Sequence, residues 1–291
     1  MKITQSFIKS MRSYLAGEEC GHLIKHQYVD GKLLEIDSKP MAEGRFFEFN
    51  VSGGLPKNKQ VPQPVWMVAA LKKPVGDRKP EDMMQGYRRA VFNAKAIKKL
   101  LQEDLGLKFL KIGVTLTKGD FQGDIDIIVQ ATKDVLFEDI SWHVGDVFVI
   151  DLKYSGLLNM DRPRDKNGWD WSDIQKIEHG TQAKQYHYIT GMPFYFLVTA
   201  STNDEDAETE DGKKTFQPTE AKFFYVPVDE HMIEAHVSEG LKLRDILDKQ
   251  VEMGLTPRPE YSKCSGCPLR ADCPDKHVIP HPVTIDLTLG V

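Results

Sequence analysis

Acidic side chains stand at the ends of two apolar segments of this 291-residue chain. In "GDVFVIDLKYSG" (145–156), Asp151 and Lys153 follow the apolar run 147–150, and in "GDIDIIVQ" (123–130), Asp124 and Asp126 alternate with isoleucines. Side chains on a strand alternate between the two faces of a sheet, so Asp151 and Lys153 share a face. If the two segments form a hairpin pair, Asp126 and Asp151 converge on one spot.

Converging carboxylates repel each other unless a cation lies between them, and hard divalent ions such as Mg²⁺ prefer oxygen ligands. Lys153 beside such a site would orient or deprotonate an attacking water, or stabilise charge in the transition state. A single D-x-K sequence is more often a pair of solvated charges, and that alternative stays open on these residues alone. We interpret Asp124 as a solvated neighbour.

Two further pairs have a spacing of four residues, which places both members on one face of a helix. Gln182 and Tyr186 form one pair in "GTQAKQYHYIT", and Gly44 and Glu48 form the other in "EGRFFEF". Alone, the first is typical of a half-buried tyrosine with a polar neighbour. The second is equally typical of an exposed acid on an amphipathic helix.

Taken in order, these motifs resemble the RecB-like branch of the PD-(D/E)XK nuclease superfamily: G-x-x-x-(H/E) at 44–48, G-x-x-D at 123–126, D-L-K at 151–153 and Q-x-x-x-Y at 182–186. The resemblance implies an α/β fold with a restriction-endonuclease-like core, in which a central mixed sheet is flanked by helices. It also implies Mg²⁺- or Mn²⁺-dependent hydrolysis of DNA phosphodiester bonds, as an exonuclease, in recombination, repair or the processing of phage or mobile-element DNA. Many members carry His where this chain has Glu48, but a carboxylate is also a natural ligand for these ions.

The resemblance assigns roles to specific residues. The implied catalytic residues are Asp126, Asp151, Lys153, Gln182 and Tyr186. The implied ligands of Mg²⁺ or Mn²⁺ are Glu48, Asp126, Asp151 and the backbone carbonyl of Leu152. Gln182 and Tyr186 would help to hold the substrate and to support the active site.

The four cysteines are unevenly distributed, because Cys20 stands alone and Cys264, Cys267 and Cys273 form the cluster "CSGCPLRADC". Four thiolates suit one zinc ion or one iron–sulfur cluster, although a zinc site usually has two close C-x₂-C pairs. One remote cysteine and a C-terminal triplet resemble the iron–sulfur staple of RecB-family nucleases, such as AddB-type subunits and CRISPR adaptation nucleases. That resemblance implies a 4Fe–4S cluster, and structural zinc remains the alternative.

A basic and aromatic segment, "NMDRPRDKNGWDW" (159–171), is the candidate DNA contact, through Arg162, Arg164, Lys166 and Trp169. Aromatic rings beside cations suit single-stranded or frayed DNA ends, although the tryptophans could equally pack locally. The chain contains no G-x-x-x-x-G-K-[ST] motif, so unwinding would require a helicase or recombination partner. The rival hypothesis is a non-catalytic DNA- or protein-binding module with a structural Cys₄ metal site.

Composition sets wider bounds. The formal net charge is −5, and 28% of residues are charged, which argues weakly against a nucleic-acid coat protein but permits a local basic groove. No apolar run of about 18 residues is present, so no membrane span is expected. The N-terminus has no apolar signal core, and we expect a cytoplasmic protein of a bacterial or phage-infected cell.

These side chains need a scaffold, and hydrophobic patterning predicts it. We expect one nuclease domain over 1–291, with the segments around Cys20 and 264–273 joined at the metal cluster. Expected helices are 4–17, 81–102, 171–190 and 229–253. Expected strands are 108–117, 124–131, 146–154, 193–202 and the segment "AKFFYVPV" at 221–228. Residues 203–220 are predicted to form a polar loop.

Overall fold

The computed structural model describes residues 1–32, 38–57, 59–137, 140–155, 180–201, 207–208, 214–216 and 220–255, together with residues 264, 267, 269 and 273. The described residues divide into two compact units. One unit contains those within 3–36 and 238–291, and the other contains those within 37–237. The prediction of a single domain stays a prediction. None of the described helices is long and apolar enough to cross a membrane.

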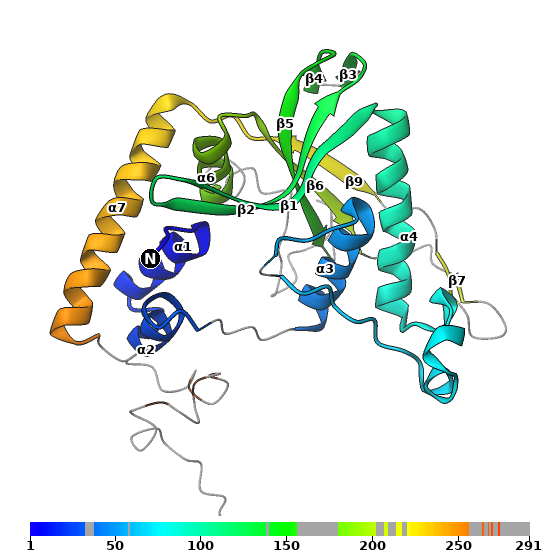
Figure 1. Cartoon of the computed structure of the whole chain (residues 1–291), viewed down its shortest axis with the longest axis horizontal. Coiled ribbons are helices and arrows are strands. Elements are labelled where there is room, and N and C mark those ends of the chain that lie inside the picture. The colour runs from blue at the N-terminus through cyan, green and yellow to red at the C-terminus, as the bar shows by residue number, and fades with distance from the viewer. Residues whose placement is uncertain are drawn as a thin grey trace, which may run out of the picture. The chain divides into compact units, whose positions relative to one another are not determined.

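A five-stranded mixed sheet is the centre of the larger unit (Figure 1). Its strands are β1 (Leu107–Lys118), β2 (Phe121–Ala131), β5 (Val147–Ser155), β6 (Phe194–Ala200) and β9 (Ala221–Tyr225), in the spatial order β1-β2-β5-β6-β9. The β5–β6 pair is parallel, and the other pairs are antiparallel. The chain therefore contains the mixed α/β sheet that is typical of a PD-(D/E)XK-like core.

Helices cover both faces of this sheet (Figure 1). On one face, α3 (Lys39–Ser52) and α4 (Gln85–Lys99) pack apolar side chains such as Phe47 and Ala90 against Ile150 and Leu152 of β5. On the other face, α6 (Thr181–Thr190) packs Ala183 and Tyr186 in a cluster with Val149, Phe194 and Phe196. Because burial of apolar area is the main favourable term in folding, the two clusters fix α3 and α6 on opposite sides of β5.

Local signals explain the helix ends. Ser38 caps α3 by accepting a hydrogen bond from the Met41 amide, and Gly53, at φ +85°, ends the helix in the left-handed conformation that glycine adopts without strain. The helix predicted over 81–102 begins later, at Gln85, because Met83 forms a β-bridge with Trp66 and holds the chain extended. It continues beyond Lys99 as a π-helical turn, Leu100–Asp104.

The sequence patterns missed the short hairpin formed by β3 (Val135–Phe137) and β4 (Ile140–Trp142), which connects β2 to β5. Two further short strands, β7 (Ala207–Glu208) and β8 (Lys214–Thr215), pair within the region predicted as a polar loop. Residues 171–179 of the helix predicted over 171–190 lie outside the described residues.

The smaller unit combines segments from both parts of the chain. It contains α1 (Gln5–Leu15), α2 (Gly21–Ile24) with the π-helical turn Lys25–Val29, and most of α7 (Glu230–Met253). Arg12 of α1 forms an ion pair with Glu239 of α7, and the hydroxyl of Tyr14 donates to Gln250 Oε1 over 3.3 Å. Residues more than 200 positions apart in the sequence are therefore in direct contact within this unit.

Candidate active site

The two predicted aspartates lie together at the point where β2 and β5 separate. The register pairs Ile127 with Ile150, so Asp126 and Asp151 come next on their strands. Both are buried, with 7% and 2% of their surfaces exposed. In place of a strand partner, the amide of Leu152 donates to Asp126 Oδ2 over 2.9 Å. The convergence that strand alternation predicted is confirmed.

A local irregularity in β1 faces Asp126. The register pairs Ile112 with Ile127 and Val114 with Ile125, and it omits Gly113, which has φ +53°. The register itself is continuous across Gly113 and shifts elsewhere in β1, between Phe109 and Lys111. The two isoleucines that flank Asp126 point to opposite faces of the sheet, because Ile127 belongs to the core cluster under α3 and Ile125 belongs to the cluster under α6. Strict strand alternation would place both on one face.

Lys153 and Gln182 both contact Asp151. The Lys153 ammonium forms an ion pair with Asp151 Oδ2, and the Gln182 side-chain amide donates to Asp151 Oδ1. Lys153 keeps 30% of its side chain exposed and lies 5.8 Å from the centroid of the Phe196 ring. Asp151 is thus held from two sides, while part of the Lys153 side chain remains exposed.

Tyr186 holds α6 against β2. Its hydroxyl donates to the backbone carbonyl of Asp124, and its ring packs on Gly123, where a Cβ would lie 2.7 Å from Tyr186 Cε1. The glycine of the G-x-x-D motif therefore makes room for the tyrosine of the Q-x-x-x-Y motif. The half-buried Asp124 accepts a hydrogen bond from the Thr115 hydroxyl through its carboxylate.

Glu48 lies on α3, and the negative charges of Asp126 and Asp151 act on its carboxyl group. Burial, followed by the negative charge of Asp126, raises the pKa of Glu48 to about 8, and Lys59 and Lys153 oppose this shift. Burial also raises the pKa of Asp151 to about 6, with Lys153 lowering it and Asp126 adding to the rise. Glu48 and Asp151 therefore both lie within the electrostatic reach of Asp126, and we refer to Glu48, Asp126 and Asp151 as the acidic cluster.

The donor chemistry of the acidic cluster fits a hard divalent cation. Glu48 Oε2 is buried and has no hydrogen-bond partner among the described residues. Burying such an oxygen costs free energy, and binding a cation or a proton would remove that cost. The cluster offers carboxylate oxygens, which Mg²⁺ and Mn²⁺ prefer. Within the described part of the chain, however, no group of three or more His, Cys, Asp or Glu side chains is placed to hold a metal ion. Asp151 and Asp126 oxygens are engaged by Lys153 and by the Leu152 amide.

One residue of this site was not predicted. Lys59, in the loop after α3, is half-buried, and the charges of Asp126, Glu48 and Asp151 raise its pKa although burial lowers it. The signal available in the sequence was weak: a loop rich in Pro, Gly and Lys directly follows the helix that carries Glu48.

The four cysteines all belong to the smaller unit, are partly exposed and form no disulfide with one another. Cys20 precedes the first residue of α2, and the Cys267 amide donates to the Cys264 carbonyl over 3.2 Å. The donor set suits an iron–sulfur cluster or zinc by its chemistry. The candidate DNA contacts Arg162, Arg164, Lys166 and Trp169 lie outside the described residues.

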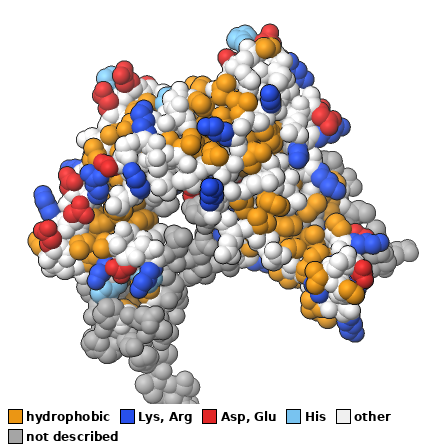
Figure 2. Space-filling model, in the orientation of Figure 1, with side chains coloured by type: hydrophobic (Ala, Val, Ile, Leu, Met, Phe, Trp, Pro, Cys, Tyr) orange, Lys and Arg blue, Asp and Glu red, His pale blue; other side chains and the backbone are white. Residues whose placement is uncertain are grey.

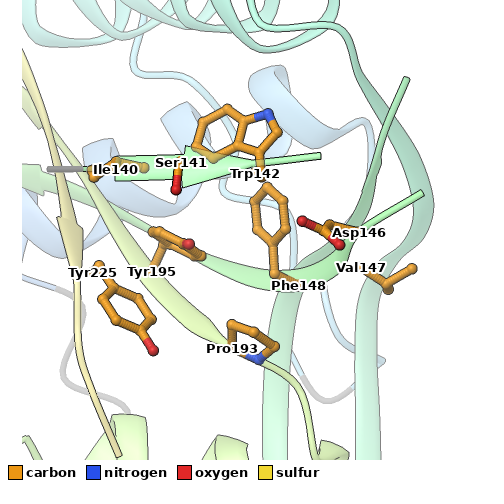
Figure 3. Close-up of a pocket in the computed structure, with 9 residues that line it drawn as sticks. All are labelled: Ile140, Ser141, Trp142, Asp146, Val147, Phe148, Pro193, Tyr195 and Tyr225. Atoms are coloured by element: carbon orange, nitrogen blue, oxygen red, sulfur yellow. The ribbon is translucent and has the colours of Figure 1, made fainter. Parts of the chain in front are cut away.

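Two surfaces outside the acidic cluster complete the description of the larger unit. A pocket of about 450 Å³ lies between β4 and the ends of β5, β6 and β9, lined by aromatic rings including Trp142, Phe148, Tyr195 and Tyr225 (Figure 3). It shares no residue with the acidic cluster. On the visible face of this unit, Lys and Arg side chains stand among hydrophobic ones (Figure 2), and the edge strand β1 carries exposed Lys108, Lys111 and Lys118.

Comparison with known proteins gives a match in structure only. No family model and no curated protein matches the chain. Among solved structures, a candidate exonuclease from Eubacterium rectale matches with a TM-score of 0.52 at 13% identity, over 100% of this chain and 94% of that one. LHK-Exo in complex with dAMP matches with a TM-score of 0.39 at 14% identity, over 91% of this chain and 93% of that one. The first likeness shows that this chain shares the fold of the Eubacterium rectale protein.

Proposed function

We propose that this protein is a nuclease that hydrolyses DNA phosphodiester bonds with Mg²⁺ or Mn²⁺ held by Glu48, Asp126 and Asp151. The observation that carries the proposal is the buried Asp151 carboxylate, which contacts both the Lys153 ammonium and the Gln182 amide and stands next to Asp126 on the paired strand β2. The charges of Asp126 and Asp151 also act on Glu48 of α3. Burying charged side chains costs desolvation free energy, and such clusters are typical of functional sites. A non-catalytic binding module has no need for a buried carboxylate–lysine cluster. The shared fold with a candidate exonuclease supports the same proposal.

The reaction adds a water oxygen to phosphorus and breaks one P–O bond to the neighbouring nucleotide, and the water proton ends on solvent or on the leaving oxygen. A divalent cation, when bound, polarises the phosphate and lowers the pKa of a coordinated water. Asp126 and Asp151 would hold it together with Glu48 and the backbone carbonyl of Leu152. The Lys153 ammonium donates to the oxygen on which negative charge develops.

Gln182 and Tyr186 act as positioning residues in this scheme. The Gln182 amide fixes one oxygen of Asp151, which leaves the carboxylate a single orientation. Tyr186 anchors α6 to β2 and so keeps Gln182 in place. A preorganised carboxylate needs no rearrangement during the reaction, and this is the usual source of electrostatic catalysis.

Further parts of the proposal concern the substrate and the second metal site. Exonuclease action at single-stranded or frayed ends, with a partner that unwinds DNA in recombination or repair, would use the basic and aromatic segment 159–171. We also propose that Cys20, Cys264, Cys267 and Cys273 hold a 4Fe–4S cluster, with zinc as the alternative. The support is the spacing of the C-terminal triplet and the assignment of all four cysteines to one unit, although no three of these described thiols are placed together to hold a metal.

A cleavage assay tests the proposed function. Labelled DNA is incubated with Mn²⁺ or Mg²⁺, and with EDTA, using the wild type and the variants Asp151→Asn, Lys153→Met and Asp124→Asn. Asp151→Asn should abolish cleavage and Lys153→Met should slow it on the order of a hundredfold. Asp124→Asn is the matched control and should cleave normally, because the Asp124 carboxylate is bonded to Thr115 and is not one of the proposed metal ligands. Full activity of Asp151→Asn would refute the assignment.

A further inference from the structure

The loop that follows α3 begins with a turn at Ser52, whose hydroxyl bonds to the backbone on both sides of it. The Ser52 hydroxyl donates to the Glu48 carbonyl over 2.9 Å and accepts a hydrogen bond from the Gly54 amide at 3.2 Å. Gly53 supplies the left-handed residue that the change of direction requires. The start of the loop is therefore tied to the helical turn that carries Glu48.

Farther along the same loop, the backbone of Leu55 packs against Gly113 of β1, opposite Asp126. A Cβ at Gly113 would lie 2.4 Å from the Leu55 carbonyl carbon, so only glycine permits this close approach of two backbones. Gly113 stands between Ile112 and Val114, and these pair with residues on either side of Asp126. The contact thus fixes the loop next to the strand position that carries a proposed metal ligand.

A turn then places Lys59 at the acidic cluster. Pro56 is buried, and its carbonyl accepts a hydrogen bond from the Lys59 amide over 2.8 Å. The Lys59 side chain is half-buried, and its ammonium interacts electrostatically with Asp126, Glu48 and Asp151. Lys57, two residues earlier in the same loop, is exposed.

We propose that Lys59 is a substrate contact of the active site, binding a phosphate oxygen of the DNA that is cleaved. The inference rests on the proposed nuclease function and adds a cation that neither the motifs nor the resemblance assigns. Three ionised carboxylates carry more charge than one bound divalent cation, and Lys153 is already paired with Asp151, so a further cation beside them lowers the repulsion that an approaching phosphate meets. Lys59 comes from a separate loop whose backbone is anchored before it, by the Ser52 turn, by the contact of Leu55 with Gly113 and by the Pro56 carbonyl, and this limits the positions that its ammonium can take.

The alternative role for Lys59 is a counter-charge that merely stabilises the carboxylates. The two roles differ in their salt dependence, because a phosphate contact releases counterions from DNA and a contact within the protein does not. Loss of one phosphate contact makes the slope of log affinity against log salt shallower by about 0.9 for duplex DNA and by about 0.7 for single strands.

The experiment measures kcat/KM for DNA cleavage at several KCl concentrations in wild type, Lys59→Met, Lys59→Arg and the control Lys57→Met. Lys59→Met should lower kcat/KM on the order of a hundredfold and make the salt slope shallower by the loss of one contact. Lys59→Arg should recover most of the rate, and Lys57→Met should match wild type. Lys59→Gln replaces Lys59→Met if circular dichroism shows that the latter is unfolded.

Two results would overturn the inference while leaving the nuclease proposal intact: wild-type rate and slope in Lys59→Met, or a reduced rate with an unchanged salt slope. A wild-type protein that cleaves no DNA with either metal would instead refute the proposed function, and the Lys59 inference with it.

Discussion

The two motif glycines should respond in opposite ways to substitution by alanine. Gly123 lies on β2 beneath the ring of Tyr186, and an added Cβ would lie 2.7 Å from Tyr186 Cε1 and 3.2 Å from Ile189 Cδ1. The ring has little freedom to move, because Tyr186 is 3% exposed, packs edge-on against Phe194 and donates its hydroxyl to the Asp124 carbonyl. Gly123→Ala should therefore displace α6.

The size of the effect follows from packing. Overfilling a well-packed core costs about 1–3 kcal/mol, and in a domain of this size each kcal/mol lowers Tm by about 2–4 °C. Cleavage should fall as well, because a shift of α6 moves the Gln182 amide away from Asp151. Thermal unfolding followed by circular dichroism, together with a urea titration, measures the stability change.

Gly44→Ala is the matched control within the G-x-x-x-E motif. The nearest atom to an added Cβ there is Tyr154 Cβ at 3.9 Å, which is an ordinary contact. Because Gly44 lies inside α3, alanine should leave stability unchanged or raise it by up to about 1 kcal/mol. Equal stability of Gly123→Ala and wild type would refute the packing argument, and so would a large loss in Gly44→Ala.

Three further predictions concern charge, positioning and the thiols. In metal-free buffer the free energy of unfolding should fall as pH rises from about 4.5 toward 8. Burial, followed by the charge of Asp126, raises the pKa of Glu48 from 4.5 to about 8. In this pH window the folded state therefore binds more protons than the unfolded state, and raising the pH favours unfolding. Urea titrations at both ends of the window check this, and an equally steep loss in Glu48→Gln would contradict it. Gln182→Ala should lower kcat about tenfold with little change in KM, since only the orientation of Asp151 is lost; steady-state kinetics with a strong rise in KM alone would contradict that role. Cys20→Ser should lower both iron content and Tm, and a variant with full iron and unchanged Tm would disprove a shared cluster.

Strand patterning carried most of the information about the acidic site. The expected pairing of 124–131 with 146–154 placed Asp126 and Asp151 at converging positions, and the register of β2 and β5 bears out that pairing, although strict alternation fails around Asp126. The four-residue spacing likewise placed Gln182 and Tyr186 on one face of α6. These features are local, so a short window of sequence contains them.

Long-range features could not be predicted in the same way. Lys59 reaches the cluster because the backbone at Leu55 packs on Gly113, a contact between residues 58 positions apart that no periodicity encodes. The β3–β4 hairpin was missed because each strand has three residues, too few for an alternating pattern to be distinguished from a loop. The late start of α4 depends on the bridge between Trp66 and Met83, which is also a tertiary contact.

Mn²⁺ binding measured by electron paramagnetic resonance tests the central claim most directly, because free Mn²⁺ gives a six-line signal that weakens on binding to protein. Wild type and Asp124→Asn should bind Mn²⁺ equally, whereas Asp151→Asn should lose most of that binding while keeping the wild-type circular dichroism spectrum. Equal binding by all three proteins, or none by the folded wild type, would contradict the assignment of Glu48, Asp126 and Asp151 as a divalent-cation site.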